Sequence, residues 1–190
     1  MQMNKICGLT IDQYIDKVTE FHGNLGPGLL IGGFMVDAAA RGMAEYEYFD
    51  AISESASCLP DAIQLLTPCT VGNGWLKIIN TGRFALTLYD KKSGNGVRVS
   101  MDASKLDRYP ETRKWFMRLV SKREQDNDAL VQEILAAGRE ILVVQTVKVS
   151  PALLVKHPPS SIAFCESCGE AYPLNGSTVC LACRGMDLYV

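Results

Sequence analysis

The tail of the chain contains two Cys-x-x-Cys motifs, Cys165-Glu166-Ser167-Cys168 and Cys180-Leu181-Ala182-Cys183. Each motif offers two thiolates on one tight turn, and only a short loop separates the two turns. Four sulfurs can surround one ion tetrahedrally at about 2.3 Å, which is the geometry of a structural zinc site. Such a site leaves no coordination position open. The tail is therefore predicted to be a small zinc finger whose metal supports folding and does no chemistry.

Two other uses of four cysteines remain open at this point: a pair of disulfides, and an iron–sulfur cluster, which also takes four thiolates. Disulfides need an oxidising compartment, and the sequence indicates none. The first residues, 1–7, lack the apolar core of a signal peptide. No apolar stretch reaches the roughly 20 residues that cross a bilayer. We therefore expect a cytoplasmic protein whose seven cysteines are metal ligands or reactive thiols.

The composition favours a small protein with no preference for polyanions. The chain has 190 residues and a net charge of −2, which allows one core domain and a small appendage. Near-even charge provides no field that attracts nucleic acid. The loop at 170–178 carries one aromatic residue, Tyr172, and no basic residue, so it lacks phosphate contacts and stacking surfaces. A nucleic-acid-binding zinc ribbon is thus a disfavoured alternative.

Prolines upstream of the tail indicate a domain boundary. Ser150-Pro151 and the segment 157–161, with consecutive prolines, bias the chain towards an extended, semi-rigid spacer. We expect a core domain over residues 1–157 and the zinc finger over residues 158–190.

The core domain is predicted to be α+β, with an antiparallel sheet and packed helices, because helices and strands segregate along the chain. Thr10 is a candidate N-cap for the first helix, and Pro27 suits the first turn of the second. Gly32 and Gly33 would let another backbone approach the second helix closely, so we expect it to be central and buried. Helices are expected over 11–21, 27–46, 58–67, 109–123 and 128–137, strands over 51–57, 75–80, 84–89, 97–101 and 141–149, and hairpin turns at 81–82 and 93–96.

Three residues of the core are candidates for a second site. His22 lies at a helix end, Cys58 at the N-terminal end of a short helix, where the helix dipole lowers a thiol pKa, and Cys69 in a glycine-containing loop. One imidazole and two thiolates form a ligand set of the kind that catalytic zinc uses. Buried cysteines are also common small hydrophobic residues, and a histidine before glycine is often a hydrogen-bonded turn residue. The residues alone leave both interpretations open.

Three stretches of the core carry a family resemblance. They are Phe21-His22-Gly23-Asn24-Leu25-Gly26-Pro27-Gly28, Cys58-x-x-Asp61-Ala62-x-Gln64 and Cys69-Thr70-x-Gly72-Asn73-Gly74. Together they resemble the FmdE family, which is named for a component of formylmethanofuran dehydrogenase. The tail cysteines resemble the treble-clef-like zinc finger that some members append. Asn24 and Gly26 stand where the family tends to have histidine and cysteine, and neither is a good transition-metal ligand.

This resemblance implies a homodimeric α+β core with an auxiliary zinc finger. It also implies association with a molybdenum- or tungsten-dependent formylmethanofuran dehydrogenase, the enzyme of the first carbon dioxide reduction step in methanogenesis. His22, Cys58 and Cys69 would line one pocket, where a second transition metal could bind. Two functions follow: a metal-binding accessory protein of this family, or a small metal- or thiol-dependent enzyme that acts through Cys58 or Cys69.

Overall fold

The structure is a computed structural model that describes residues 5–155, 158, 160–174 and 176–186. The chain divides into two compact units, Met1–Leu154 and Val155–Val190. The expected domain boundary falls at His157, which lies outside the described residues.

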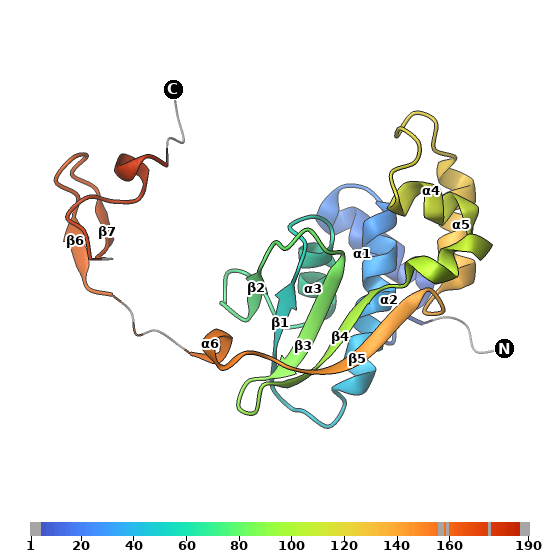
Figure 1. The fold of residues 1–190 in the computed structure, drawn as a ribbon, viewed down its shortest axis with the longest axis horizontal. Coiled ribbons are helices and arrows are strands. Elements are labelled where there is room, and N and C mark those ends of the chain that lie inside the picture. Colours follow the sequence, from blue (N-terminus) through green and yellow to red (C-terminus); the bar gives the residue numbers. More distant parts are fainter. Residues whose placement is uncertain (1–4, 156–157, 159, 175, 187–190) are drawn as a thin grey trace. The chain divides into compact units, whose positions relative to one another are not determined.

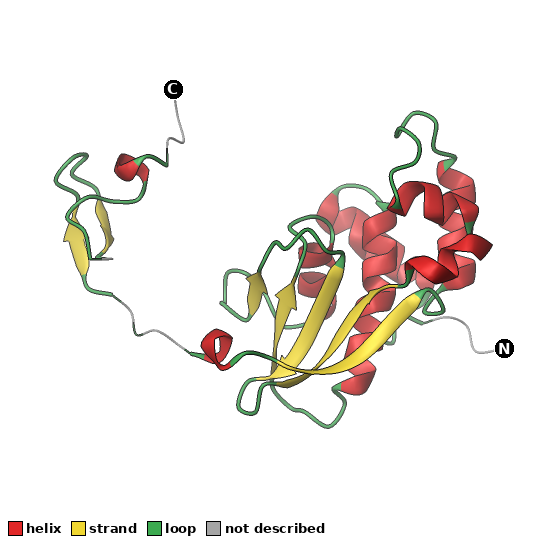
Figure 2. Ribbon diagram, viewed as in Figure 1, coloured by secondary structure: helices red, strands yellow, loops and turns green. Residues whose placement is uncertain are grey.

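The first unit is built on a five-stranded sheet whose longer helices cover one face (Figures 1 and 2). On the other face, Leu153 and Leu154 pack with Ile52 and Tyr89. The strand order is β2-β1-β3-β4-β5. Neighbours β1, β3, β4 and β5 pair antiparallel, whereas β2 runs parallel to β1. The predicted α+β class is confirmed. The strands are β1 (Phe49–Ser53), β2 (Leu76–Ile78), β3 (Ala85–Asp90), β4 (Asn95–Met101) and β5 (Leu142–Lys148).

Local sequence signals explain where several helices begin. Thr10 and Gln13 form the capping box of α1: each side-chain oxygen accepts the other residue's backbone N–H. Asp126 caps α5 by accepting the N–H of Ala129. No helix in the described part of the chain is long and apolar enough to cross a bilayer. The helices are α1 (Ile11–His22), α2 (Pro27–Gly42), α3 (Leu59–Leu66), α4 (Pro110–Phe116), α5 (Asn127–Ala137) and α6 (Pro151–Leu154), with a 3-10 turn, η1, at Ala103–Arg108.

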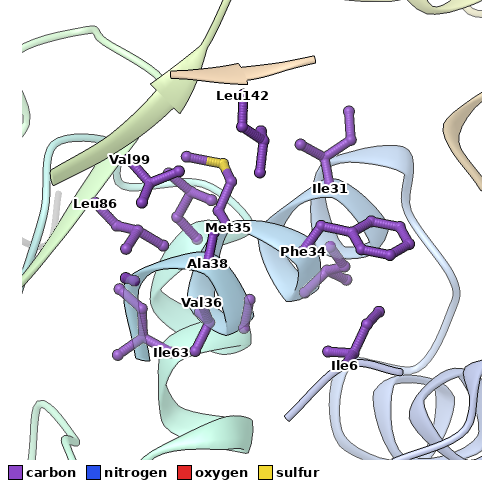
Figure 3. Packing of buried hydrophobic residues seen from close by; sticks show 14 of the residues in the cluster. Ile6, Ile31, Phe34, Met35, Val36, Ala38, Ile63, Leu86, Val99 and Leu142 are labelled. Carbon is purple, nitrogen blue, oxygen red and sulfur yellow. The ribbon is translucent and has the colours of Figure 1, made fainter. Parts of the chain in front are cut away.

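Helix α2 is the centre of the hydrophobic core, as predicted. Every residue from Gly28 to Ala39 is buried. The helix contacts β3, β4 and β5 as well as α1, α3 and α5. In Figure 3, Met35 lies among Leu86, Val99 and Leu142 of the sheet, so the apolar surface of α2 fills the space between sheet and helices.

Two glycines let neighbouring helices approach α2 closely. A Cβ atom at Gly32 would lie 2.8 Å from Cβ of Ala62 on α3. A Cβ atom at Gly33 would lie 2.6 Å from Cε1 of Tyr14 on α1. These approaches are shorter than van der Waals contact, so the packing of α1 and α3 depends on glycine at both positions.

Some expectations about the secondary structure of the core are wrong, and the helix expected over 27–46 already ends at Gly42. Thr81-Gly82 does not form a hairpin turn between paired strands, because β2 pairs with β1 and not with β3. Helix α3 connects β1 to β2, since parallel neighbours need a crossover connection. The helix expected over 109–123 ends at Phe116.

The second unit is small and has almost no hydrophobic core. It contains a hairpin of β6 (Ile162–Phe164) and β7 (Ala171–Pro173), and a 3-10 turn, η2, at Ala182–Arg184. Among its described residues, Cys165 is the one buried hydrophobic side chain. Apolar burial therefore contributes little to the stability of this unit.

The close contact between Gly33 and the Tyr14 ring leads to a prediction about stability. Gly33→Ala should lower the free energy of unfolding by about 1–3 kcal/mol, because the new methyl group overlaps the Tyr14 ring. That ring cannot shift freely, since its hydroxyl donates to the Leu29 carbonyl at 2.7 Å. Urea denaturation measures the change. The control Gly72→Ala, whose Cβ would lie 4.0 Å from its nearest neighbour, should change stability by less than about 0.5 kcal/mol. Equal stability of the two variants would contradict the packing described here.

Candidate metal centre

The structure brings the four tail cysteines together. The sulfurs of Cys165, Cys168, Cys180 and Cys183 all lie within 4.8 Å of one another. No other group of three or more histidine, cysteine or acidic side chains in the described residues converges in this way. A tetrahedral ion with bonds of about 2.3 Å separates its sulfur ligands by about 3.8 Å. The cluster is therefore close to the size that a single ion requires.

Backbone hydrogen bonds hold the first cysteine turn in place. The N–H of Cys165 donates to the Glu170 carbonyl at 2.9 Å, and the N–H of Gly169 donates back to the Cys165 carbonyl at 2.8 Å. Gly169 has a φ of +78°, which favours glycine. These bonds close the turn at the end of β6, so the sulfurs of Cys165 and Cys168 come from one compact loop.

The second cysteine turn is tied to the first through sulfur. The N–H of Cys180 donates to Sγ of Cys165 at 3.3 Å. Backbone N–H groups of Cys180 and Cys168 lower the pKa of the Cys165 thiol to about 6. The thiolate is the form that binds metal. The polypeptide therefore stabilises the metal-binding form of its one buried tail cysteine.

The distances between the sulfurs distinguish the three possible uses of the four cysteines, which are one metal ion, two disulfides or an iron–sulfur cluster. All seven cysteines are free thiols, and the sulfurs of Cys168 and Cys180 are 4.0 Å apart, far beyond the disulfide length of about 2.05 Å. An iron–sulfur cluster would place the four sulfurs on several irons and so farther apart. The observed spacing fits one tetrahedral ion.

His22, the first candidate of the core, pairs with an acidic residue. Its Nδ1 lies 2.6 Å from Oδ2 of Asp61, which joins the end of α1 to the first turn of α3. The sequence includes Asp61 in one of the three stretches that resemble the family but does not indicate this pairing, because the two residues are far apart in the chain. His22 therefore has a structural partner that the sequence analysis missed.

Cys58 is the residue before α3 and has a strained backbone conformation. Its φ of 60° and ψ of −52° belong to a γ-turn in which the Leu59 N–H donates to the Ser57 carbonyl at 2.6 Å. A Cβ atom at Gly28 would lie 2.8 Å from the Cys58 sulfur, so the thiol packs against the start of α2. Burial, and then the Asp61 carboxylate, raise the pKa of Cys58. The expected lowering of this pKa by the helix dipole is therefore wrong, because burial outweighs it.

Cys69 lies elsewhere in the core. It is fully buried, and its Sγ donates to the Phe49 carbonyl at 3.4 Å. Burial raises the pKa of this thiol too. Cys58 precedes α3 and Cys69 follows it, and a helix of that length separates its two ends by about 12 Å. The structure thus pairs His22 with Asp61, but in the described residues His22, Cys58 and Cys69 do not converge as a group of metal ligands.

These raised pKa values predict slow thiol chemistry in the core. Alkylation of Cys58 and Cys69 by iodoacetamide should be slow near neutrality and rise with a midpoint above the ordinary thiol value of 9.0. Mass spectrometry of the two peptides across a pH series measures both midpoints. The urea-unfolded chain is the control and should titrate near the ordinary value. A midpoint below the ordinary value in the folded protein would contradict the burial of that thiol.

Comparisons with known proteins agree with this architecture. Residues 21–149 match the family described as FmdE, Molybdenum formylmethanofuran dehydrogenase operon, and residues 156–190 match the FmdE treble clef zinc finger. A crystal structure of a tungsten formylmethanofuran dehydrogenase FmdE-like protein from Syntrophus aciditrophicus is 44% identical, with a TM-score of 0.92 and 100% of both chains covered.

A curated archaeal protein is also similar over most of the chain. A probable S-adenosyl-L-methionine-binding protein of Archaeoglobus fulgidus is 30% identical over 89% of this chain, and the chain spans 52% of that protein. The family match extends over well more than half of the residues and includes the region of His22, Cys58 and Cys69. The chain therefore belongs to the FmdE family and carries the treble clef zinc finger of that family at its C-terminal end.

Proposed function

We propose that this protein is a homodimeric accessory protein of the FmdE type whose tail holds one structural zinc ion. Its partner is a molybdenum- or tungsten-dependent formylmethanofuran dehydrogenase of methanogenesis. The observation that carries the metal part of the proposal is the convergence of four cysteine sulfurs within 4.8 Å.

The donor set explains the choice of zinc. Four thiolates are soft ligands, and a tetrahedral set of them is typical of structural zinc. Because all four positions around the ion belong to cysteine, the site offers no place for water or substrate. The metal supplies folding free energy to a unit that buries almost no apolar side chains.

The proposal assigns one metal ion to each chain. In the core, Nδ1 of His22 is engaged by Asp61, and the Cys69 thiol is buried and donates to the Phe49 carbonyl. Asp61 leaves Nε2 of His22 free to bind a metal, but a second transition metal would have to displace the hydrogen bond of the buried Cys69 thiol. It would also have to draw together cysteines on opposite ends of α3. The zinc content expected for the purified protein is therefore one ion per chain.

An accessory role fits the core better than a thiol-dependent activity. A nucleophilic cysteine needs a depressed pKa, and burial raises the pKa of both Cys58 and Cys69. The partnership with a dehydrogenase is supported by the Syntrophus aciditrophicus protein, which is described as FmdE-like and is similar over its whole length.

Removing one tail ligand tests the zinc site. Cys165→Ser should reduce bound zinc from one ion per chain to nearly none and unfold the tail, because metal-binding free energy is folding free energy in so small a unit. The first unit should keep its secondary structure. Elemental analysis and far-ultraviolet circular dichroism measure these two effects. The control Cys7→Ser removes a thiol outside the cluster and should leave zinc at one per chain. Unchanged zinc in Cys165→Ser would contradict the assignment.

Recovery of the partner tests the accessory role. The affinity-tagged protein, expressed in a methanogen that makes formylmethanofuran dehydrogenase, should co-purify with that enzyme and its molybdenum or tungsten. Light scattering of the purified chain should give twice its mass of 20.8 kDa. An untagged strain provides the control. Purification that repeatedly recovers the tagged chain without any molybdenum or tungsten enzyme would contradict the partnership.

A further inference from the structure

Figure 1 shows the loop that connects α4 to α5. Basic and apolar residues lie together in this loop. Met117 and Leu119 are 50% and 54% exposed, among the more exposed large hydrophobic residues of the first unit. Three exposed cations, Arg118, Lys122 and Arg123, lie in the same short stretch. We call residues 117–123 the basic loop.

The way in which helix α4 ends does not account for an arginine at position 118 or for the exposure of Leu119. The Arg118 N–H donates to the Trp115 carbonyl at 3.2 Å, and the Leu119 N–H donates to the Lys114 carbonyl at 2.9 Å, which is the Schellman pattern of helix termination. The left-handed position of that pattern usually holds glycine, but here Arg118 occupies it with a φ of +53°. The next residue normally packs an apolar side chain back onto the helix, whereas Leu119 is exposed. Arg118 thus occupies a position where glycine is usual, and Leu119 is exposed at a position where an apolar side chain usually packs on the helix.

Ring packing and a side-chain hydrogen bond hold the two ends of the basic loop in place. The Phe84 ring packs edge-to-face on Trp115 and Phe116, with ring centroids 6.0 Å and 6.4 Å apart. Gln125 donates to Glu111 at 2.9 Å, which ties the far end of the loop back to α4. These contacts hold both ends of the loop, so its exposed side chains project from a fixed position.

The acidic residue next to the basic loop is engaged elsewhere, because the Glu124 carboxylate accepts from the N–H and hydroxyl of Ser121. Two cations of α4 have carboxylate partners: Arg113 pairs with Asp107 at 3.3 Å and Lys114 with Glu111 at 2.6 Å. In the part of the chain that the structure describes, Arg118, Lys122 and Arg123 form no ion pair with a carboxylate. A basic surface with apolar side chains between its charges therefore faces solvent.

We propose that the basic loop is a docking surface for an acidic polypeptide segment of a partner protein that carries apolar side chains between its carboxylates. Carboxylates complement the three cations, and apolar side chains cover Met117 and Leu119. Nucleic acid fits less well, because the nearby aromatic rings are packed on Phe84 rather than free to stack on bases. Anionic membranes are usually recognised by clusters of about 4–8 basic residues, more than the loop offers.

A peptide-binding experiment tests this surface. The probe is a fluorescent peptide, about 16 residues long, of alternating glutamate and leucine pairs, and its dissociation constant is measured by anisotropy with the full-length protein. Raising the salt from about 50 to 200 mM should weaken binding about fivefold, since exposed charges are screened. The triple variant R118G/K122Q/R123Q should weaken it by about tenfold or more. The double variant Met117→Ser with Leu119→Ser should weaken it by a similar factor.

Two controls keep the result interpretable. Arg118→Gly alone should leave Tm unchanged or raise it by about 2–4 °C, because glycine suits the left-handed position, and yet it should weaken peptide binding about threefold. Lys92→Gln removes an exposed cation at the turn between β3 and β4 and should leave binding unchanged. Binding of the triple variant with wild-type affinity would overturn the proposal. Tighter binding of a DNA duplex or of anionic phosphatidylserine vesicles than of the peptide would also overturn it.

Discussion

The first unit depends on the burial of α2 on all sides. Its apolar residues meet three strands on one side and three helices on the others, and the glycines at 32 and 33 set how closely α1 and α3 can approach. The same packing determines the chemistry of the core. Cys58 is pressed against the first turn of α2 at Gly28, so its thiol is desolvated and its pKa is raised. A core closed by hydrophobic packing needs no metal to fold.

The second unit, unlike the first, has almost no hydrophobic core. Ile162 and Phe164 on β6 are exposed, and of the described residues in this unit only Cys165 is a buried hydrophobic side chain. A unit of this size with so little apolar burial is unstable unless another interaction constrains it. Four converging sulfurs and the short backbone hydrogen bonds of the two cysteine turns provide that interaction once an ion is bound. Apolar burial therefore stabilises the first unit, and the proposed zinc ion would stabilise the second by coordination.

The sequence predicts those features that depend on residues close together in the chain. The N-cap at Thr10, the apolar composition of α2 and the two Cys-x-x-Cys turns are local patterns, and each appears as expected. Features that depend on distant residues were not predictable. The pairing of His22 with Asp61 requires knowledge of how α1 packs on α3, and the parallel pairing of β2 with β1 requires knowledge of the sheet order. The early end of α4 was missed because arginine occupies a position where glycine is the usual signal.

The central claim is that one metal ion binds each chain, in the tail and not in the core. An anomalous difference map from crystals of the purified protein, collected on both sides of the zinc absorption edge, tests it most directly. We expect one peak per chain, about 2.3 Å from each of the sulfurs of Cys165, Cys168, Cys180 and Cys183. A map with no peak among these sulfurs, or with a second peak bridging His22 and Cys58, would contradict it.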